Sequence, residues 1–138
     1  TCNLSNCSLE NTRIQNVLFK GCKIMGLDFS KCDKFLIGFN FKDSFISMSV
    51  FSYLDLNDIS FNGCEIFESD FIETNLMNAN FDNSDLKYSR FHKTNLSFAS
   101  LENAKNYIID PNQNNLRKAS FSFPEVVGLL AAFDINIK

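Results

Sequence analysis

The feature that most constrains this chain is a five-residue spacing of large apolar side chains. Such a period matches neither the α-helical period of ~3.6 residues nor the strand period of two. A short repeat of this kind indicates a solenoid, in which each unit buries its apolar side only by stacking on its neighbours. Nineteen positions hold only Leu, Ile or Phe, in two runs: Leu4, Leu9, Ile14, Phe19, Ile24 and Phe29, then Phe41, Ile46, Phe51, Leu56, Phe61, Ile66, Phe71, Leu76, Phe81, Leu86, Phe91, Leu96 and Leu101.

A second position of the repeat, two residues before each large one, holds mostly small side chains. Residues two apart in an extended chain point to the same side, so both positions should face inward. The other three positions are mostly Asn, Asp, Glu, Lys and Ser, and should face solvent. The small residues are Cys2, Cys7, Thr12, Val17, Cys22, Ser44, Ser49, Cys64, Ser69, Thr74, Ala79, Ser84, Ser89, Thr94 and Ala99.

From Phe41 to Leu96 the large positions alternate between Phe and an aliphatic residue. If coils stack in register, each column holds one residue type only when a coil contains an even number of units. Four units per coil would place Phe41 over Phe61 and Phe51 over Phe71, with aliphatic columns between them. The sequence therefore predicts an all-β, four-sided parallel β-helix of about five coils, a rod of ~24 Å at ~4.8 Å per coil.

The repeat resembles the motif of the pentapeptide-repeat proteins, which is a small residue, Asn or Asp, Leu or Phe, and two variable polar residues. The resemblance covers about residues 2–105 and implies a right-handed four-sided β-helix, here over residues 1–106. The clearest matches are Ala79-Asn80-Phe81-Asp82-Asn83, Ser84-Asp85-Leu86-Lys87-Tyr88, Thr74-Asn75-Leu76 and Cys2-Asn3-Leu4.

The repeat changes phase once, between residues 30 and 40. Twelve residues separate Phe29 from Phe41 instead of ten, which predicts a two-residue insertion. Taking Leu36 as the central residue keeps the aliphatic column of Ile14 and Leu56, and places the insertion just before it. A tolerated corner insertion is favoured over a functional loop.

The C-terminal segment, residues 107–138, departs from the repeat. Leu116 and Phe121 are again five apart, which predicts a further partial coil. The run Ser122-Phe123-Pro124-Glu125 is typical of a capping box before a short helix over Val126–Ala132. The open end of a β-solenoid needs covering, and relatives also dimerise through this segment, so capping alone and capping with a homodimer interface both remain open. The candidate residues are Phe123, Val126, Val127, Leu129, Leu130 and Phe133.

Four of the five cysteines occupy the small inward position, and Cys32 begins a similar triplet. Their count is odd and no CxxC spacing occurs, so reduced, buried thiols are the preferred interpretation. Reduced thiols indicate a cytoplasmic protein. No apolar run approaches the ~20 residues that span a bilayer, and no signal peptide opens the chain. The chain begins inside a repeat without an initiator Met, which favours a truncated N-terminus.

No catalytic pattern is present. His92 is the only histidine and should point outward, and the sequence holds no Gly-rich phosphate loop, GxSxG or HExxH. Carboxylates on a convex surface do not form the concave pocket that an active site needs. We expect no enzyme activity, no catalytic residues, no cofactor and no metal.

The outward charges are unevenly distributed, although the net charge is only −3. No Lys, Arg or His lies between Lys42 and Lys87, and basic residues lie toward both ends. A surface with such an acidic middle repels nucleic acid and attracts basic surfaces. The nine carboxylates of this stretch, which we call the acidic belt, are Asp43, Asp55, Asp58, Glu65, Glu68, Asp70, Glu73, Asp82 and Asp85.

The first functional hypothesis is a DNA mimic that binds DNA gyrase or topoisomerase IV and modulates fluoroquinolone action. The C-terminal stretch from Asp110 to Leu130 is similar to the Qnr-like, quinolone-resistance branch of the family, for which this mode is the expectation. The modest net acidity departs from strong mimicry, and a merely solubilising acidic surface is an equal alternative. The candidate surface comprises the acidic belt without Asp43, namely Asp55, Asp58, Glu65, Glu68, Asp70, Glu73, Asp82 and Asp85.

The second hypothesis is a general protein-interaction scaffold of unknown partner. Phe67 and Ile72 occupy outward positions, as do Phe45, Met48 and Tyr88. Exposed apolar patches usually mark interfaces, although these side chains could equally pack on one another between coils. A third hypothesis is a structural module of a longer chain.

Overall fold

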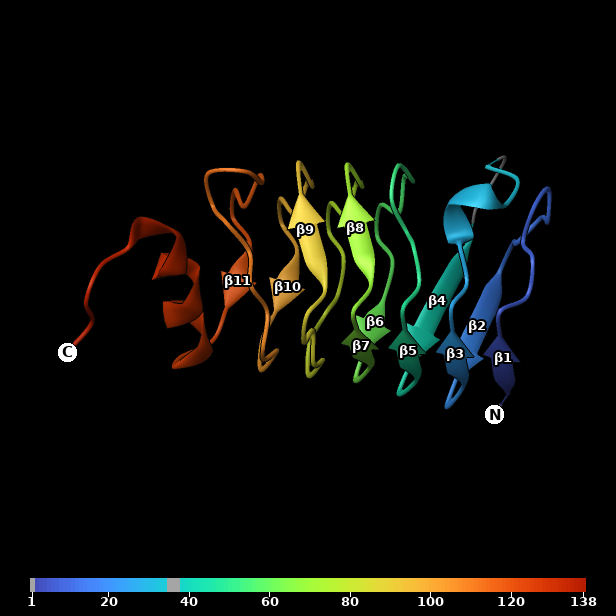
Figure 1. Ribbon diagram of the computed structural model, residues 1–138, viewed down its shortest axis with the longest axis horizontal. Helices are drawn as coiled ribbons and strands as arrows, with labels where there is room; N and C mark the ends of the chain where they lie inside the picture. Colours follow the sequence, from blue (N-terminus) through green and yellow to red (C-terminus); the bar gives the residue numbers. More distant parts are fainter. Residues whose placement is uncertain (1, 35–37) are drawn as a thin grey trace.

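The chain forms a parallel β-solenoid, seen in a computed structural model that describes residues 2–34 and 38–138. Figure 1 shows the coils stacked along the long axis, with the first coil at one end and a helix beyond the last coil. This arrangement confirms the predicted fold class of stacked parallel strands. The strands are β1 (Asn3–Ser5), β2 (Val17–Lys20), β3 (Lys23–Met25), β4 (Phe39–Lys42), β5 (Phe45–Ser47), β6 (Phe61–Asn62), β7 (Glu65–Phe67), β8 (Asp70–Ile72), β9 (Arg90–His92), β10 (Ser100–Leu101) and β11 (Ser120–Phe121).

The strands pair in the orders β1-β3-β5-β7, β2-β4-β6, β8-β9 and β10-β11, all parallel. Paired residues are usually twenty apart in sequence, as in Asp70 with Arg90, which corresponds to four five-residue units per coil. The ladder from β1 to β7 continues through single bridges from Glu65 to Asp85 and from Asp85 to Lys105. It therefore has six levels rather than about five, because the polar stretch after Leu101 still pairs with the coil before it.

The large residues of each repeat stack in four inward columns, and the predicted Phe columns are confirmed. The Phe51, Phe71 and Phe91 rings stack at 5.1 and 5.0 Å between centroids. The Phe41, Phe61 and Phe81 rings stack at 5.2 and 5.1 Å, and the two columns meet edge to face. We number the columns in chain order from Ile46, Phe51, Leu56 and Phe61.

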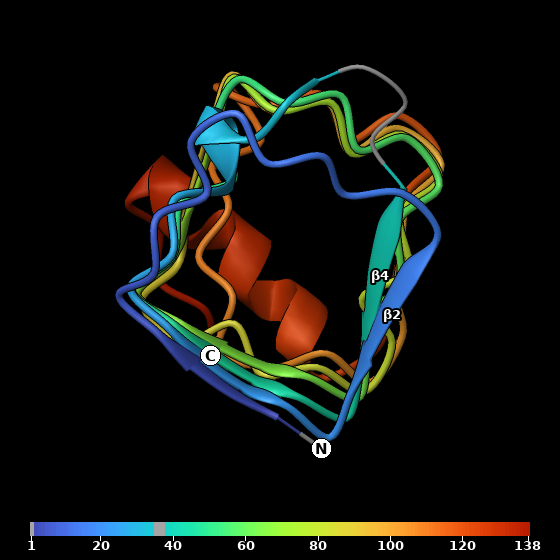
Figure 2. The same ribbon diagram turned by 90° about the vertical axis from the view of Figure 1, so that its right-hand side faces the viewer.

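A sharp turn follows each column, because the second residue after the large one has a positive φ. This left-handed conformation is easiest for Gly and Asn, which often stand there. Figure 2 shows the successive coils lying over one another around a common axis. We name four corners after the columns they follow: first, Gly26, Met48, Glu68 and Tyr88; second, Tyr53, Glu73 and Lys93; third, Asp58, Asn78, Phe98 and Lys118; fourth, Asp43, Gly63 and Asn83.

The small inward position also stabilises the stack through hydrogen bonds. Ser69 Oγ accepts a hydrogen bond from the Ser49 backbone N–H (3.2 Å) and donates one to the Phe67 carbonyl (3.1 Å). Ser89 repeats the first of these contacts toward the Ser69 N–H. Small hydroxyls thus remain buried without unsatisfied polar groups.

The two-residue insertion is confirmed by the register. Arg13 pairs with Asp33, twenty residues on, whereas Val17 pairs with Phe39, twenty-two residues on. The extra residues therefore lie between Asp33 and Phe39, after the short 3-10 helix η1 (Phe29–Lys31). Leu36, the proposed central residue, lies outside the described residues.

The C-terminal segment contains the predicted partial coil and helix. Phe121 pairs with Leu101 and Asn115 with Asn95, and the 3-10 helix η2 (Glu125–Phe133) follows. The predicted capping box is wrong, because η2 has no side-chain cap hydrogen bond. Ser122 Oγ instead accepts a hydrogen bond from the Asn103 N–H at 3.0 Å, so its hydroxyl links η2 to the preceding coil.

The cysteines differ from the expectation of five reduced thiols, because Cys2 and Cys22 form a disulfide. They occupy the same small position on successive levels, and their Cα atoms are 4.6 Å apart. In-register stacking brings equivalent positions to about the strand spacing, within the ~4.4–6.8 Å that a disulfide spans. Cys32 and Cys64 are buried free thiols as expected, whereas the free thiol Cys7 is exposed.

Candidate protein-binding surface

The acidic belt surrounds the rod instead of lying on one face. Glu65 and Asp85 lie along the first column, and Asp70 along the second. Asp55 lies along the third column, and Asp82 follows Phe81 in the fourth. Glu68, Glu73 and Asp58 occupy the first, second and third corners. The candidate carboxylates therefore lie in the same middle coils of the rod, but they point outward on different sides of it.

Four belt carboxylates bind the next coil. Asp70 accepts two hydrogen bonds from the Arg90 guanidinium, at 2.6 and 2.8 Å, and this contact raises the pKa of Arg90. Asp55 accepts one from the Asn75 amide (2.9 Å), and Asp85 one from the Asn106 amide (2.9 Å). Asp82 accepts one from the Glu102 backbone N–H (3.0 Å). These four side chains hold coils together, which their sequence positions did not reveal.

The other four candidate carboxylates are available to a partner. Asp58, Glu65, Glu68 and Glu73 are exposed. Their carboxylates make no hydrogen bond or ion pair with any residue that the structure describes.

The two apolar candidates, Phe67 and Ile72, are only half exposed. The Phe67 ring packs edge to face on Phe45, 5.5 Å between centroids, so for this pair the packing alternative applies. Among the middle coils, the more exposed apolar side chains stand instead at corners: Met48 (53%), Tyr53 (62%), Tyr88 (64%) and Phe98 (50%). Sequence reasoning missed Phe98, although its place two residues after Leu96 marks it as a corner residue.

The six C-terminal candidate residues, in η2 and just before it, divide into a half-buried and an exposed group. Val126 and Leu129 are half-buried, and Leu129 packs against the core. Four other candidates face solvent: Phe123 (87%), Val127 (39%), Leu130 (39%) and Phe133 (47%). One side of the helix thus covers the end of the rod, and the exposed residues leave an uncovered apolar surface.

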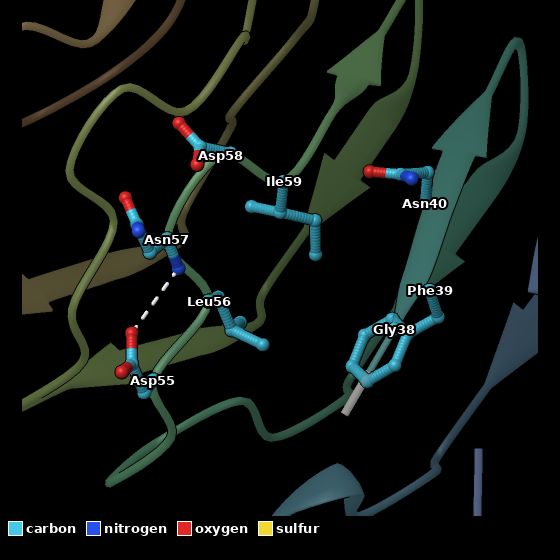
Figure 3. Close-up of a pocket in the computed structure, with 8 residues that line it drawn as sticks. All are labelled: Gly38, Phe39, Asn40, Asp55, Leu56, Asn57, Asp58 and Ile59. Atoms are coloured by element: carbon cyan, nitrogen blue, oxygen red, sulfur yellow. Dashed lines mark hydrogen bonds between the residues drawn. The ribbon is translucent and has the colours of Figure 1, made fainter. Parts of the chain in front are cut away.

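A pocket of about 220 Å³ lies beside Gly38–Asn40 and Asp55–Ile59 (Figure 3). Phe39 and Leu56 are buried there, and Asp55 accepts a hydrogen bond from the Asn57 N–H at 3.3 Å. Its volume is below the ~300 Å³ of ordinary small-molecule sites. Within residues 2–34 and 38–138, no group of three His, Cys, Asp or Glu side chains could hold a metal ion.

Burial also makes the remaining inward titratable groups unreactive. It raises the pKa of the Cys64 thiol to about 11 and also raises the pKa of the Cys32 thiol. A thiol with a raised pKa carries little of the nucleophilic thiolate at neutral pH. None of the helices in the described residues is long and apolar enough to cross a membrane.

These features define a β-solenoid whose accessible chemistry lies on an outer, convex surface. A family profile described as Pentapeptide repeats matches residues 2–33, 49–83 and 74–105, in 8 copies. The chain belongs to the pentapeptide repeat family.

Comparison with solved structures found further matches, of which the first described below shares the fold. A trypsin-treated form of QnrB1, described as a plasmid-mediated fluoroquinolone resistance protein, matches with a TM-score of 0.74 and 16% identity. The match covers 100% of this chain and 66% of that one. HetL, a pentapeptide repeat protein involved in heterocyst differentiation regulation in the cyanobacterium Nostoc sp. strain PCC 7120, matches with a TM-score of 0.38 and 19% identity, over 86% and 50% of the two chains. Comparison with curated protein sequences found no match.

Proposed function

We propose that this chain is a non-enzymatic, protein-binding rod whose acidic belt takes the place of DNA on a type II topoisomerase. The partner would be DNA gyrase or topoisomerase IV, and binding would modulate fluoroquinolone action in the cytoplasm. The acidic belt is the observation that carries the proposal. A surface of this sign does not bind nucleic acid directly.

The charge density of the belt supports mimicry. Its nine carboxylates lie within about two coils, a height of ~10 Å at the usual strand spacing, or one carboxylate per ~1.1 Å. Double-stranded DNA carries one charge per ~1.7 Å of axis. As on DNA, the charges surround the axis, so a basic groove meets some of them from every side. The fold shared with QnrB1 adds support, since that protein is described as a fluoroquinolone resistance protein.

A supercoiling assay with purified DNA gyrase, run with and without a fluoroquinolone, tests the proposal. We expect micromolar protein either to inhibit supercoiling or to restore activity that the drug has blocked. If the protein neither inhibits supercoiling nor protects gyrase from the drug at that concentration, a topoisomerase partner is refuted. The alternative, a general protein-interaction scaffold, predicts that outcome together with specific capture of another protein.

We further infer that the chain forms a homodimer through η2, because three of its apolar side chains, and Phe123 just before it, remain exposed after the helix has covered the rod. Replacing Val127 and Leu130 by Glu should convert a dimer into a monomer in light scattering. Leu18→Glu is the matched control, since Leu18 is exposed (59%) near the opposite end of the rod. A monomeric mass for the unaltered chain over a wide concentration range would contradict this inference.

A further inference from the structure

The first corner differs from the others in having apolar side chains on both sides of it. Met48 and Tyr88 stand in the corner itself. Phe45 and Phe67 lie beside it along the first column, and Val50 and Ile72 lie beside it along the second. We call these six residues the corner ridge.

The most exposed side chains of the corner ridge are Met48 and Tyr88. Both have a positive φ, of 49° and 62°, and are 53% and 64% exposed. A side chain in this backbone conformation is less favourable than Gly or Asn. Tyr53 stands in the second corner, which has Val50 and Ile72 on one side but Asp55 and Asn75 on the other. Phe98 stands in the third corner, with Asn75 and Asn95 on one side and Asn80 and Ser100 on the other.

Free carboxylates lie within the corner ridge. Glu68 stands between Met48 and Tyr88 in the corner, and Glu65 lies one level below Phe45. Asp70 is held by Arg90, so it does not contribute a free charge. Lys87 Nζ lies 5.2 Å from the centre of the Tyr88 ring, so Tyr88 marks the edge of the acidic region.

We propose that the corner ridge is the side by which this chain enters a cleft of its protein partner, one with an apolar floor and lysine or arginine side chains on its walls. Because Glu65 and Glu68 are negative, a complementary cleft carries positive charge. The apolar side chains supply the contact that remains when salt screens these charges. The inference rests on the proposed function, because it names the side of the acidic belt that touches the topoisomerase.

The test compares equivalent corners in one binding assay with purified DNA gyrase. Met48→Asn with Tyr88→Asn alters the corner ridge, whereas Tyr53→Asn and Phe98→Asn alter the second and third corners. Asn suits the positive φ of every site, so all variants should melt at or above the temperature of the unaltered chain. We expect the corner-ridge variant to bind at least about tenfold more weakly, and each control within about twofold of the unaltered chain.

The outcomes separate the two proposals. If the unaltered chain binds gyrase and all the corner variants bind equally well, the corner ridge is wrong and the proposed function stands. If a variant of a control corner loses the most affinity for gyrase, the partner contacts another side of the rod and the corner-ridge proposal is again wrong. If the unaltered chain does not bind, both fail. Should the corner-ridge change instead abolish self-association in light scattering, its occupant is a second copy and the cleft proposal is overturned.

Discussion

Phe71 shows how single residues stabilise the rod. Its ring is fully buried, stacked between Phe51 and Phe91 and in edge contact with Phe61 and Phe81. Phe71→Ala should lower the free energy of unfolding by ~3–5 kcal/mol, because it removes contacts on two levels and leaves a cavity. Ile108→Ala, at a site 69% exposed, should change it by no more than ~0.5 kcal/mol. Urea unfolding measures both; equal losses would contradict the column packing.

Tyr107 is a buried residue with a polar group that the fold does not satisfy. It is 5% exposed, and its hydroxyl has no hydrogen-bond partner among the described residues. Burial, with a smaller contribution from the charge of Glu125, raises its pKa to about 12. The folded state then holds the Tyr107 proton more tightly than the unfolded state. The resulting contribution to the free energy of unfolding is fully present below pH ~10 and is lost as pH rises from ~10 toward 12.

Tyr107→Phe removes both the unsatisfied hydroxyl and this titration. We expect the variant to be as stable as the unaltered chain or more stable by ~1 kcal/mol at neutral pH, since an unpaired buried hydroxyl is unfavourable. Its stability should also depend less on pH above 10. Thermal unfolding across that range is the measurement, and an unchanged pH dependence would show that Tyr107 is not the group responsible.

Residue-level prediction from sequence succeeded where a column determines the environment. The Phe/aliphatic alternation identified which rings stack, because register leaves a buried side chain only one set of neighbours. It did not reveal that Asp70 binds Arg90 or that Asp82 accepts a backbone hydrogen bond from the next coil. Outward side chains have several available partners, and their choice depends on rotamers that the repeat does not specify.

At the scale of elements, the first two coils are joined covalently through Cys2 and Cys22. The sequence placed both cysteines in one inward column twenty residues apart, which is the signal that could have predicted their bond. The helix η2 was predicted from a capping box at Ser122–Glu125; the helix forms but the capping box does not, because the Ser122 hydroxyl accepts a hydrogen bond from Asn103. Tertiary contacts thus decided details that local patterns left undetermined.

Counting accessible thiols tests the disulfide. A maleimide should label one thiol, Cys7, in the native chain, three after unfolding, and five after unfolding with reductant. Cys2→Ala should leave Cys22 free and make the first coil more sensitive to proteases, since closing a loop of about twenty residues contributes ~3 kcal/mol. Five labelled thiols in the unfolded chain without reductant would restore the interpretation of fully reduced cysteines.

At the scale of the whole molecule, charge is arranged in three zones along the axis. The acidic belt lies between two zones in which basic residues exceed acidic ones, and their sum is the net −3. At physiological salt the Debye length is ~8 Å, shorter than the ~10 Å height of the belt. A partner bound at the belt therefore responds to local carboxylates more than to net charge.

Two variants of equal net charge separate local charge from total charge. Asp58→Asn, Glu65→Gln, Glu68→Gln and Glu73→Gln neutralise the free belt carboxylates, whereas Glu10→Gln, Glu102→Gln, Glu125→Gln and Asp134→Asn neutralise four exposed carboxylates outside the belt. Each set changes the net charge from −3 to +1. We expect the belt variant to lose most of its affinity for gyrase and much of the salt dependence of binding, since it removes the charges that attract the basic groove. The second variant should retain both. Equal losses in the two, measured as Kd against salt concentration, would mean that total charge rather than the belt governs the encounter.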